Sequence, residues 1–428
     1  MSSRTLEVWC FGAAAGTLED GADGLTFAYL PEWAAAGRPP LSQSLPLDGT
    51  FALAAAGAFF GGLLPEGTPR EILARRLGVS SGNDFALLAA LAGDTAGAIT
   101  LLPVGELPPP SDPRRDVRWL DDAELATEIE RLPTRPLHID EDGDYRLSLA
   151  GAQDKLPVVV GTDGRVGVTN GRTPSTHILK TPIATLEHTV ANEAMCLDLG
   201  RRLGIPVASA EPRRAGSREC LLVARYDREV GAGDGGTRRL HQEDFCQALG
   251  IPAARKYQVE GGPTLPDCFA LLRRASSVPA ADAVHMLDQV TLSFLVGNHD
   301  AHAKNYSLLY RPDRTELAPA YDILSTFVYR GAVRLSRKLA MSFGSEYRPD
   351  YVRARHLADM LNACGLGPTA ARRRIESIAR AAPEHAQAAR DALADGGWDA
   401  PVLGRIVEMV TQRSGWLHDA TRKTHDVN

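Results

Sequence analysis

The sequence has no long apolar run, no paired cysteines and no leader-like N-terminus. No stretch of about 18 residues is both apolar and free of charge, which argues against a membrane-spanning helix. The six cysteines are dispersed without a C-x-x-C pair, as expected for reduced thiols in a cytoplasmic protein. The segment Met1–Trp9 lacks the apolar core of a secretion signal. Together these absences predict a cytoplasmic protein that does not contact a membrane.

The sequence is also poor in positive charge. Its 47 Lys and Arg residues are outnumbered by 53 Asp and Glu residues, giving a formal net charge of −6 at pH 7. A nucleic-acid-binding domain usually carries a basic surplus, which this chain as a whole does not. The run Arg372-Arg373-Arg374 is a candidate for contact with DNA phosphates, although a solvated helix face explains it more simply. Any DNA contact is therefore expected to be local or to come from a partner.

The length and composition predict more than one domain. With 428 residues, 44% of them hydrophobic and 23% charged, the chain exceeds one ordinary hydrophobic core. A Pro-rich segment at residues 108–113 marks the first boundary. We expect an N-terminal subdomain over residues 1–112, a sheet-rich part over 115–235 and a mostly helical part over 236–428. In the helical part, separate helices are expected on either side of Pro383.

The stretch from Phe294 to Ser307 concentrates polar residues directly after a helical apolar pattern that ends at Gly297. Within it, Asp300 and Asn305 stand five residues apart, the spacing of base and metal-binding amide in the kinase loop H-R-D-x-x-x-x-N. Asp322 follows between apolar neighbours. Phosphoryl transfer needs a carboxylate to accept the hydroxyl proton, and an Asp and an Asn for magnesium. The stretch therefore favours a kinase.

A second interpretation of the same loop is a metal-dependent phosphohydrolase. The pattern His-Asp-x-His would then supply His299 and His302 as metal ligands. Such a site needs further histidines at helical spacing nearby, whereas the other histidines are scattered along the chain. The loop alone thus favours a kinase and leaves the hydrolase as an alternative.

The elements before this loop follow the order of a kinase small lobe. A strand, a small-residue loop and a second strand precede a strand ending at Lys180, a helix over 186–203 and two further strands. Gly151-Ala152-Gln153 would cover phosphates with backbone N–H groups, and Lys180 would contact the phosphates, with Glu193 as a possible partner. Singly, each feature has an ordinary structural explanation. Together they predict an α+β, protein-kinase-like two-lobed fold with an extra N-terminal α/β subdomain.

Several motifs resemble those of the HipA family, bacterial serine/threonine kinases that form the toxin half of HipBA toxin–antitoxin systems. The two most specific are S-x-A-G-A-Q-x-K at residues 148–155 and N-x-D-x-H-x-K-N at residues 298–305. Residues 176–180, 192–193, 225–228, 321–325 and 338–341 match as well, with weaker support from residues 40–47 and 64–67. The resemblance covers nearly the whole chain.

The resemblance implies a role for each matching position. Asp300 would be the catalytic base, Asn305 and Asp322 would hold Mg²⁺, and Ser148 would be the autophosphorylation site. The implied ATP-binding residues are Ala150, Gly151, Ala152, Gln153, Asp154, Lys155, Lys180, Ala224, Arg225, Tyr226, His302, Lys304 and Tyr321. In this set residues 224–226 form the hinge, where the backbone reads adenine. Ala224 stands where Glu is expected, which leaves hinge recognition to backbone groups.

The resemblance also implies cofactors and partners. ATP and Mg²⁺ would be the cofactors, an aminoacyl-tRNA synthetase the protein substrate, and growth arrest the outcome. A small helix-turn-helix antitoxin of the HipB type would be the partner that carries most of the DNA binding. Two other functions stay open here: a transcriptional co-repressor scaffold with incidental kinase activity, and a small-molecule phosphotransferase. The intact lysine, base and metal positions argue against a loss of kinase activity.

Overall fold

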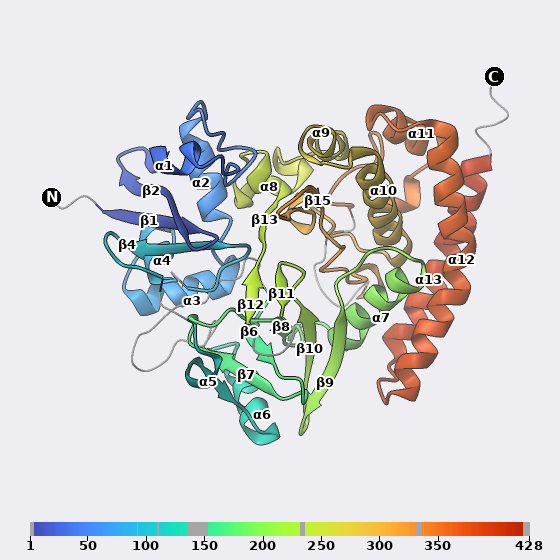
Figure 1. Cartoon of the computed structure of the whole chain (residues 1–428). Coiled ribbons are helices and arrows are strands. Elements are labelled where there is room, and N and C mark those ends of the chain that lie inside the picture. Colours follow the sequence, from blue (N-terminus) through green and yellow to red (C-terminus); the bar gives the residue numbers. More distant parts are fainter. Residues whose placement is uncertain are drawn as a thin grey trace. The chain divides into compact units, whose positions relative to one another are not determined.

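The structure, a computed structural model, describes residues 4–91, 93–108, 111–134, 153–231, 236–329, 336 and 338–422. The chain divides into two compact units (Figure 1). The first contains residues 1–181, 213–254 and 309–312, and the second contains residues 182–212, 255–308 and 313–428. Most of the described strands belong to the first unit, whereas the long helices belong to the second.

The N-terminal part of the first unit is a four-stranded antiparallel sheet. Its strands are β1 (Thr5–Cys10), β2 (Ala13–Gly21), β3 (Gly24–Tyr29) and β4 (Ile99–Pro103), in the order β3-β2-β1-β4. Alternate residues of β1, namely Leu6, Val8 and Cys10, are buried on one face, as the two-residue period of a strand requires. Trp9 points to the other face and is half-buried. The sheet therefore has a core face and an outer face.

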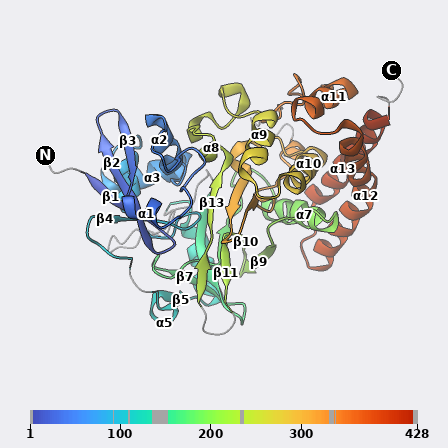
Figure 2. The same cartoon turned by 45° about the horizontal axis from the view of Figure 1, so that its top comes forward.

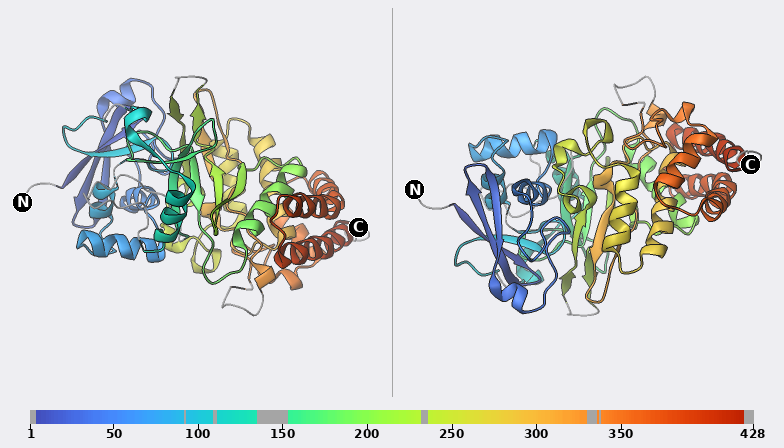
Figure 3. Two further views of the ribbon diagram at one scale, coloured as in Figure 1. Left: turned by 90° about the horizontal axis from the view of Figure 1, so that it is seen from below. Right: turned by 90° about the horizontal axis from the view of Figure 1, so that it is seen from above.

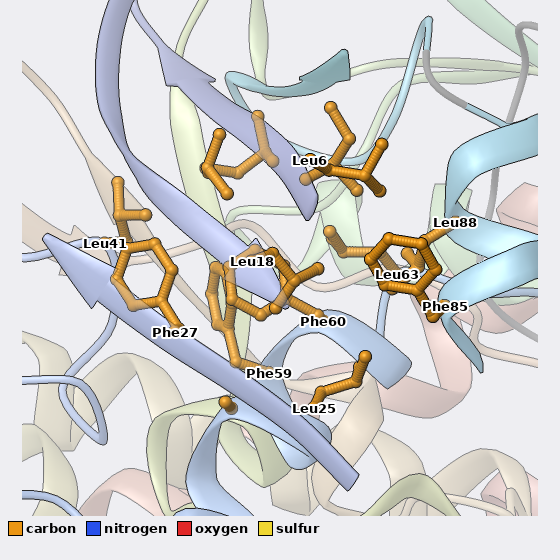
Figure 4. Packing of buried hydrophobic residues seen from close by; sticks show 14 of the residues in the cluster. Leu6, Leu18, Leu25, Phe27, Leu41, Phe59, Phe60, Leu63, Phe85 and Leu88 are labelled. Carbon is orange, nitrogen blue, oxygen red and sulfur yellow. The ribbon is translucent and has the colours of Figure 1, made fainter. Parts of the chain in front are cut away.

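Helices cover the core face of this sheet. They are α1 (Pro31–Ala35), α2 (Leu53–Gly61), α3 (Gly67–Leu77) and α4 (Asp84–Ala90). Figure 4 shows Phe59 and Phe60 of α2 meeting strand residues such as Leu18. The Phe60 ring lies 5.0 Å from that of Phe59 and 5.3 Å from that of Phe27. Burying each such side chain stabilises the folded state by about 1.5–3 kcal/mol. The cluster is therefore a hydrophobic core of the N-terminal part.

The first unit also contains a six-stranded sheet. Its strands are β5 (Val117–Trp119), β6 (Lys155–Val160), β7 (Val166–Thr169), β8 (His177–Lys180), β9 (Ala210–Ala215) and β10 (Arg218–Ala224), in the order β5-β7-β6-β8-β10-β9. The antiparallel β6–β7 pair confirms the hairpin predicted around the turn at Gly161–Gly164. Helix α6 (Asp122–Arg131) starts with a capping box at Asp121 and packs Leu125 and Ile129 against the sheet.

Short elements complete the first unit. They are α5 (Pro113–Asp116), β11 (Arg228–Val230), β12 (Thr237–Arg239), β13 (His241–Asp244) and α8 (Phe245–Ala248). The 3₁₀ turn η1 (Ala253–Arg255) starts in the first unit and ends in the second. Strands β11 and β12 pair antiparallel with each other. Strand β14 (Ser307–Tyr310) starts in the second unit and ends in the first.

The second unit is built from six helices among its described residues. They are α7 (Thr189–Arg202), α9 (Leu265–Ala275), α10 (Pro279–Val296), α11 (Ala354–Ala363), α12 (Pro368–Asp395) and α13 (Pro401–Arg422). Shorter elements are η2 (Gln258–Glu260), η3 (Ala303–Asn305), β15 (Thr315–Leu317), η4 (Phe327–Tyr329) and η5 (Pro349–Tyr351). Helices α12 and α13 lie side by side (Figures 2 and 3) and both pack on α7 and α10.

The expectation of two helices around Pro383 is wrong, because α12 continues through this proline. Proline lacks the N–H group that a helix interior needs. Packing outweighs that loss: Ala379, Ala382 and Ala386 are buried on one side of α12. Arg374 of the same helix donates two hydrogen bonds to the buried Asp288 of α10, at 2.7 and 2.6 Å. This arginine is therefore engaged within the protein.

No helix in the described part of the chain has the length and apolar character needed to cross a membrane.

Candidate active site

The site of the second unit begins where α10 ends. Gly297 has a φ of 73° and closes the helix, and a Cβ there would approach Phe327 Cβ to 2.8 Å. Only glycine fits this position, because both its conformation and its space exclude a side chain. Arg413 of α13 donates a hydrogen bond to the Phe294 carbonyl near the end of α10 and stacks over the Phe294 and Phe327 rings. The start of the polar loop is thus fixed by a distant helix.

Asp300 lies at the surface of this loop with its backbone tied down on both sides. Its N–H donates to Asn298 Oδ1 at 3.0 Å, and its carbonyl accepts from Asn305 Nδ2 at 2.9 Å and His302 N at 2.8 Å. Tyr257 donates its hydroxyl to Asp300 Oδ1 at 2.6 Å. No described residue donates to the second carboxylate oxygen, Oδ2. Tyr257 therefore holds one carboxylate oxygen of Asp300, and the other oxygen, Oδ2, can accept a proton.

Asn305 and Asp322 supply the oxygen atoms suited to magnesium. Because Asn305 uses its Nδ2 on the Asp300 carbonyl, its Oδ1 faces away from that bond and remains an acceptor. Asp322 is exposed and has a φ of 58°, a left-handed conformation that is rare outside glycine and often found at functional sites. Among the described residues no group of three or more His, Cys, Asp or Glu could hold a metal. Two protein ligands fit Mg²⁺, which keeps waters and substrate phosphates.

The chain after Asp322 is anchored to α7 by Asn192. The Asn192 side chain accepts from Ser325 N at 2.8 Å and donates to Ser325 O at 3.0 Å. It also donates to the Tyr329 hydroxyl at 3.0 Å. Asn192 is completely buried, so these bonds are shielded from water. One asparagine thus holds the backbone that follows the proposed metal ligand.

Two further contacts join the loop of Asp300 to the segment of Asp322. The Tyr321 hydroxyl donates to the Lys304 carbonyl at 2.8 Å and shares a 2.6 Å hydrogen bond with Ser307 Oγ. His299 donates its backbone N–H to Thr326 Oγ1 at 3.0 Å. Tyr321 and Lys304 were both expected to bind ATP. The structure places the Tyr321 hydroxyl between loop residues, and the nucleotide role of both stays a prediction.

The two histidines of this loop are buried. His302 packs edge-on against the Tyr257 ring at 5.2 Å, and its contact with ATP stays a prediction. The His299 ring lies against Phe327, with its Nε2 at 3.4 Å from Arg413. His299 is therefore surrounded by an aromatic ring and a cation, which is unsuitable for a metal ligand.

In the first unit, the predicted phosphate-binding lysine lies at the end of a central strand. Lys180 is buried on β8, in register with Lys155 of β6. Beside them, Gln153 Nε2 donates to the Thr181 carbonyl at 2.8 Å, and Thr181 N donates to the Asp154 carbonyl at 3.2 Å. Burial raises the pKa of the Asp154 carboxyl. These bonds hold the described end of the predicted phosphate-binding loop beside the end of β8, where Lys180 lies.

Glu193, the predicted partner of Lys180, is buried on α7 in the second unit. Its pairing with Lys180 stays a prediction. The remaining predicted positions Ser148, Ala150, Gly151 and Ala152 lie outside the described residues.

The predicted hinge has an additional structural role. Arg225 lies in an arginine–aspartate cluster within the first unit, which comprises Asp94, Arg225, Asp227, Arg228 and Arg239. Arg225 contacts Asp227 at 2.8 Å, and Arg228 contacts Asp94 at 2.6 Å. Burial alone would raise the pKa of Asp227, but the two guanidinium groups outweigh it and hold this pKa at about 2. The Arg225 side chain thus serves the fold.

Backbone and side-chain bonds fix the rest of the hinge. Arg225 N donates to the Thr176 carbonyl at 3.0 Å, and the Tyr226 hydroxyl donates to Gln242 Oε1 at 2.6 Å. Ala224 ends β10 opposite His177. The contacts of these three positions with adenine stay predictions.

Three residues of the site were not identified from the sequence. Tyr257 lies in an irregular stretch without a motif, and Arg413 lies in a helix with no polar signal that distinguishes it. Asn192 belongs to one of the family-like stretches, but its role was not apparent. Each acts on residues far along the chain, with separations of 43, 119 and 133 positions. Local sequence patterns carry no information about contacts of this kind.

The first unit carries most of the strands, and the helical second unit carries a loop in which Asp300 and Asn305 stand five residues apart. These features are those of an enzyme of the protein-kinase class. The family model described as "HipA N-terminal domain" matches residues 6–102, and the family model described as "HipA-like C-terminal domain" matches residues 147–386. The chain is 34% identical over 393 residues to the serine/threonine-protein kinase toxin HipA of Shewanella oneidensis, covering 89% of this chain and 88% of that protein. The chain therefore belongs to the HipA family of serine/threonine-protein kinase toxins.

Two other comparisons agree. The chain is 44% identical over 383 residues to "Putative kinase Y4mE" of Sinorhizobium fredii, covering 88% of this chain and 90% of that protein. It matches the HipA chain of a solved complex of Shewanella oneidensis HipA, HipB and operator DNA with a TM-score of 0.80 and 30% identity, covering 98% and 97% of the two chains. The predicted family, kinase-like fold and enzyme class are confirmed, and the activity is nucleotide-dependent phosphotransfer. The hydrolase interpretation is wrong.

Proposed function

We propose that this kinase uses Mg-ATP to phosphorylate a serine or threonine of a translation protein, with an aminoacyl-tRNA synthetase as the first candidate, and thereby arrests growth. The observation that carries the proposal is the geometry of Asp300. Its backbone is fixed by three hydrogen bonds, one carboxylate oxygen is held by Tyr257, and the other remains available for a hydroxyl proton. A general base needs this combination of fixed position and free acceptor.

The other site residues complete the proposed chemistry. Asn305 Oδ1 and the Asp322 carboxylate would hold Mg²⁺, which neutralises phosphate charge when bound. Lys180, at the end of β8, would contact the ATP phosphates as a cation. Asp300 would take the proton from the substrate hydroxyl. The hinge and loop positions predicted from the sequence would bind the rest of the nucleotide.

We also propose that the enzyme limits itself by autophosphorylation at Ser148. In the sequence this residue lies between Arg146 and Lys155 and opens the S-x-A-G-A-Q-x-K motif. A phosphate adds about −1.5 to −2 charges near pH 7, which repels the phosphates of a bound nucleotide. Intact mass and peptide mapping after incubation with Mg-ATP test the modification. An unmodified Ser148 in an active preparation, or equal ATP affinity of the two forms, contradicts the switch.

The proposed partner is a small helix-turn-helix antitoxin that neutralises the kinase and carries most of the DNA binding. Two observations support it: the similar Shewanella oneidensis HipA was solved with HipB and operator DNA, and this chain carries a net charge of −6. The same solved complex favours one alternative, a co-repressor scaffold whose kinase activity is incidental. Nucleotide affinity measured with and without magnesium separates the two, because a scaffold does not need magnesium-dependent binding.

Phosphoproteomics after controlled expression tests the main proposal. Cells expressing the wild type are compared with cells expressing Asp300→Asn, which preserves the side-chain shape but removes the base. We expect growth arrest and a small set of newly phosphorylated translation proteins with the wild type only. Equal phosphorylation by the variant contradicts the role of Asp300. Arrest without any new phosphoprotein contradicts the proposed substrate class.

A further inference from the structure

A cavity of about 840 Å³ lies within the first unit, and none of its described lining residues belongs to the proposed kinase site. One wall is the outer face of the N-terminal sheet, with Trp9, Thr100 and Leu102. The rest of the lining includes Leu77, Ala89 and Ala90, together with Gly171, Arg172, Pro174 and residues 237–239 of the same unit. Ligand sites for small molecules typically enclose about 300–1,000 Å³, so this cavity has the size of a binding site.

Phe11 stands at the edge of this cavity in an unfavourable backbone conformation. It forms the two-residue turn between β1 and β2 with Gly12, and both have positive φ, 51° and 73°. Such turns prefer Asn, Asp or Gly, because a bulky side chain is strained there. Phe11 is nonetheless 45% exposed, and its ring meets the His241 ring edge-on at 6.2 Å, so burial in the core does not explain it. An aromatic ring kept at a strained, exposed position next to a cavity points to a binding role.

Trp9 contributes a second observation. It lines the cavity on the outer face of β1, and its indole Nε1 is buried without a hydrogen-bond partner. Buried N–H groups in folded proteins almost always have an acceptor. The indole and the Phe11 ring therefore offer aromatic surface together with one unused donor.

The charged residues of the lining favour an anion. Arg172, Arg238 and Arg239 line the cavity, whereas Glu106 is the only acidic residue among its described lining. Arg238 is bonded to Glu229, and Arg239 to backbone carbonyls such as that of Gly97. The exposed Arg172 makes no side-chain hydrogen bond or ion pair with the described residues. Its guanidinium group is thus free to bind a carboxylate, sulfonate or phosphate.

We propose that this cavity is a binding site for a small anion with a flat, apolar ring system. The ring would lie against Trp9, Phe11 and Leu102, with an acceptor directed at the indole, and the anionic group would pair with Arg172. This site is separate from the kinase chemistry, so the proposal does not depend on the proposed substrate or on Ser148.

A pair of matched fluorescent probes tests the proposal on the full chain with saturating Mg-ATP. One probe is 8-anilinonaphthalene-1-sulfonate, and the other is N-phenyl-1-naphthylamine, the same ring system without the sulfonate. We expect one saturable site for the sulfonate. Phe11→Asn removes the ring while suiting the turn, and Arg172→Gln removes the charge. Each change should weaken binding of the sulfonate at least about tenfold, because a ring stack or a charge-assisted bond is lost.

Arg218→Gln is the matched control, because Arg218 is a partly exposed arginine of the same unit that does not line the cavity. It should bind the sulfonate as the wild type does. In Arg172→Gln the preference for the sulfonate over the uncharged probe should disappear. The proposal fails if either cavity variant keeps the wild-type affinity within about twofold, or if both probes bind the wild type equally. Thermal unfolding of all variants shows whether each remains folded.

Discussion

At the scale of single residues, the hydrogen bond from Tyr257 to Asp300 has a direct kinetic consequence. Tyr257→Phe keeps the ring that packs on His302 but removes the donor that orients the carboxylate. We expect kcat to fall about threefold to tenfold, the range that follows from losing one hydrogen bond, with little change in ATP affinity. Steady-state kinetics with a peptide or lysate substrate measure this. Tyr351→Phe, at an exposed tyrosine elsewhere in the second unit, is the control.

Unchanged kcat in Tyr257→Phe would mean that the backbone bonds alone position Asp300. A larger KM for ATP at constant kcat would place Tyr257 in nucleotide binding instead. Either outcome contradicts the positioning role.

Asp322 and Asp300 can be distinguished by their dependence on magnesium. Asp322→Ala removes the proposed anionic metal ligand, so magnesium-dependent affinity for ATP should fall at least about tenfold. Asp300→Asn leaves both proposed metal ligands in place, so this affinity should stay within about twofold of the wild type. Calorimetric titration with ATP, with and without MgCl₂, measures both. Equal magnesium-dependent affinities of the two variants would remove Asp322 from the metal site.

The sequence points to those residues of the candidate site that share a short, recognisable spacing. Asp300 and Asn305 lie in one loop, and the preceding Gly297 is recognisable as a helix end. The supporting residues could not be identified in this way. Tyr257, Asn192 and Arg413 reach the site only because the chain folds back, and nothing in their local sequence encodes the contact.

At the scale of elements, Asn192 is the connection between α7 and the backbone after Asp322. Asn192→Ala would leave Ser325 N and O buried without their partners, which we expect to destabilise the second unit by about 2–4 kcal/mol. Magnesium-dependent ATP affinity should fall as well, because the Asp322 segment loses its anchor. Urea unfolding and calorimetry measure the two effects.

Asn192→Asp is the informative companion variant. It keeps an acceptor for Ser325 N but cannot donate to Ser325 O or Tyr329. It should therefore be destabilised as well, since the two acceptors lose their donor. Wild-type stability in both variants would show that packing alone holds this segment.

The predicted helices and strands are confirmed where the hydrophobic pattern and the turn signals agree, as in the β6–β7 hairpin and at the end of α10. It failed at Pro383, where the local rule predicts a break but the buried alanines of α12 keep the helix continuous. The failure illustrates how tertiary packing can outweigh a local backbone preference.

At the scale of the whole molecule, buried polar groups join the N-terminal subdomain to the rest of the first unit. One group is the arginine–aspartate cluster. The second is centred on Glu243, which accepts from Ser42 Oγ at 2.5 Å, from Gln43 N at 3.0 Å and from the Tyr310 hydroxyl. Composition does not reveal the contacts of Ser42 and Gln43 with Glu243, because these partners lie about 200 positions apart in the sequence.

The Glu243 group predicts a specific dependence of stability on pH. Burial raises the pKa of Glu243 to about 7, although its hydrogen bonds partly oppose this rise. The contribution of Glu243 to the free energy of unfolding is therefore present at low pH and is lost as the pH rises through about 7. Burial lowers the pKa of the nearby His241 to about 4. As the pH falls, His241 therefore binds a proton in the unfolded chain before it does so in the folded chain. This difference lowers the stability of the folded chain between about pH 6.5 and 4. The two effects have opposite signs and largely cancel between about pH 4.5 and 6.5.

Glu243→Gln should expose the contribution of His241. Between about pH 6.5 and 5 the variant should lose about 1–2 kcal/mol of local stability, while the wild type changes little. Hydrogen exchange of peptides covering residues 41–47, corrected for intrinsic rates, measures this. Parallel pH profiles of the wild type and the variant would contradict the opposing titrations.

The contact of Arg413 with the end of α10 also sets an order of events during synthesis. The ribosome makes the Asp300 loop well before it makes Arg413, which lies 119 positions after the carbonyl it binds. At about 5–20 residues per second, roughly 6–24 seconds pass before the support for that loop exists. A growing chain therefore cannot complete its active site while most of α13 is still untranslated. A toxin kinase built in this way becomes active only late in its own synthesis.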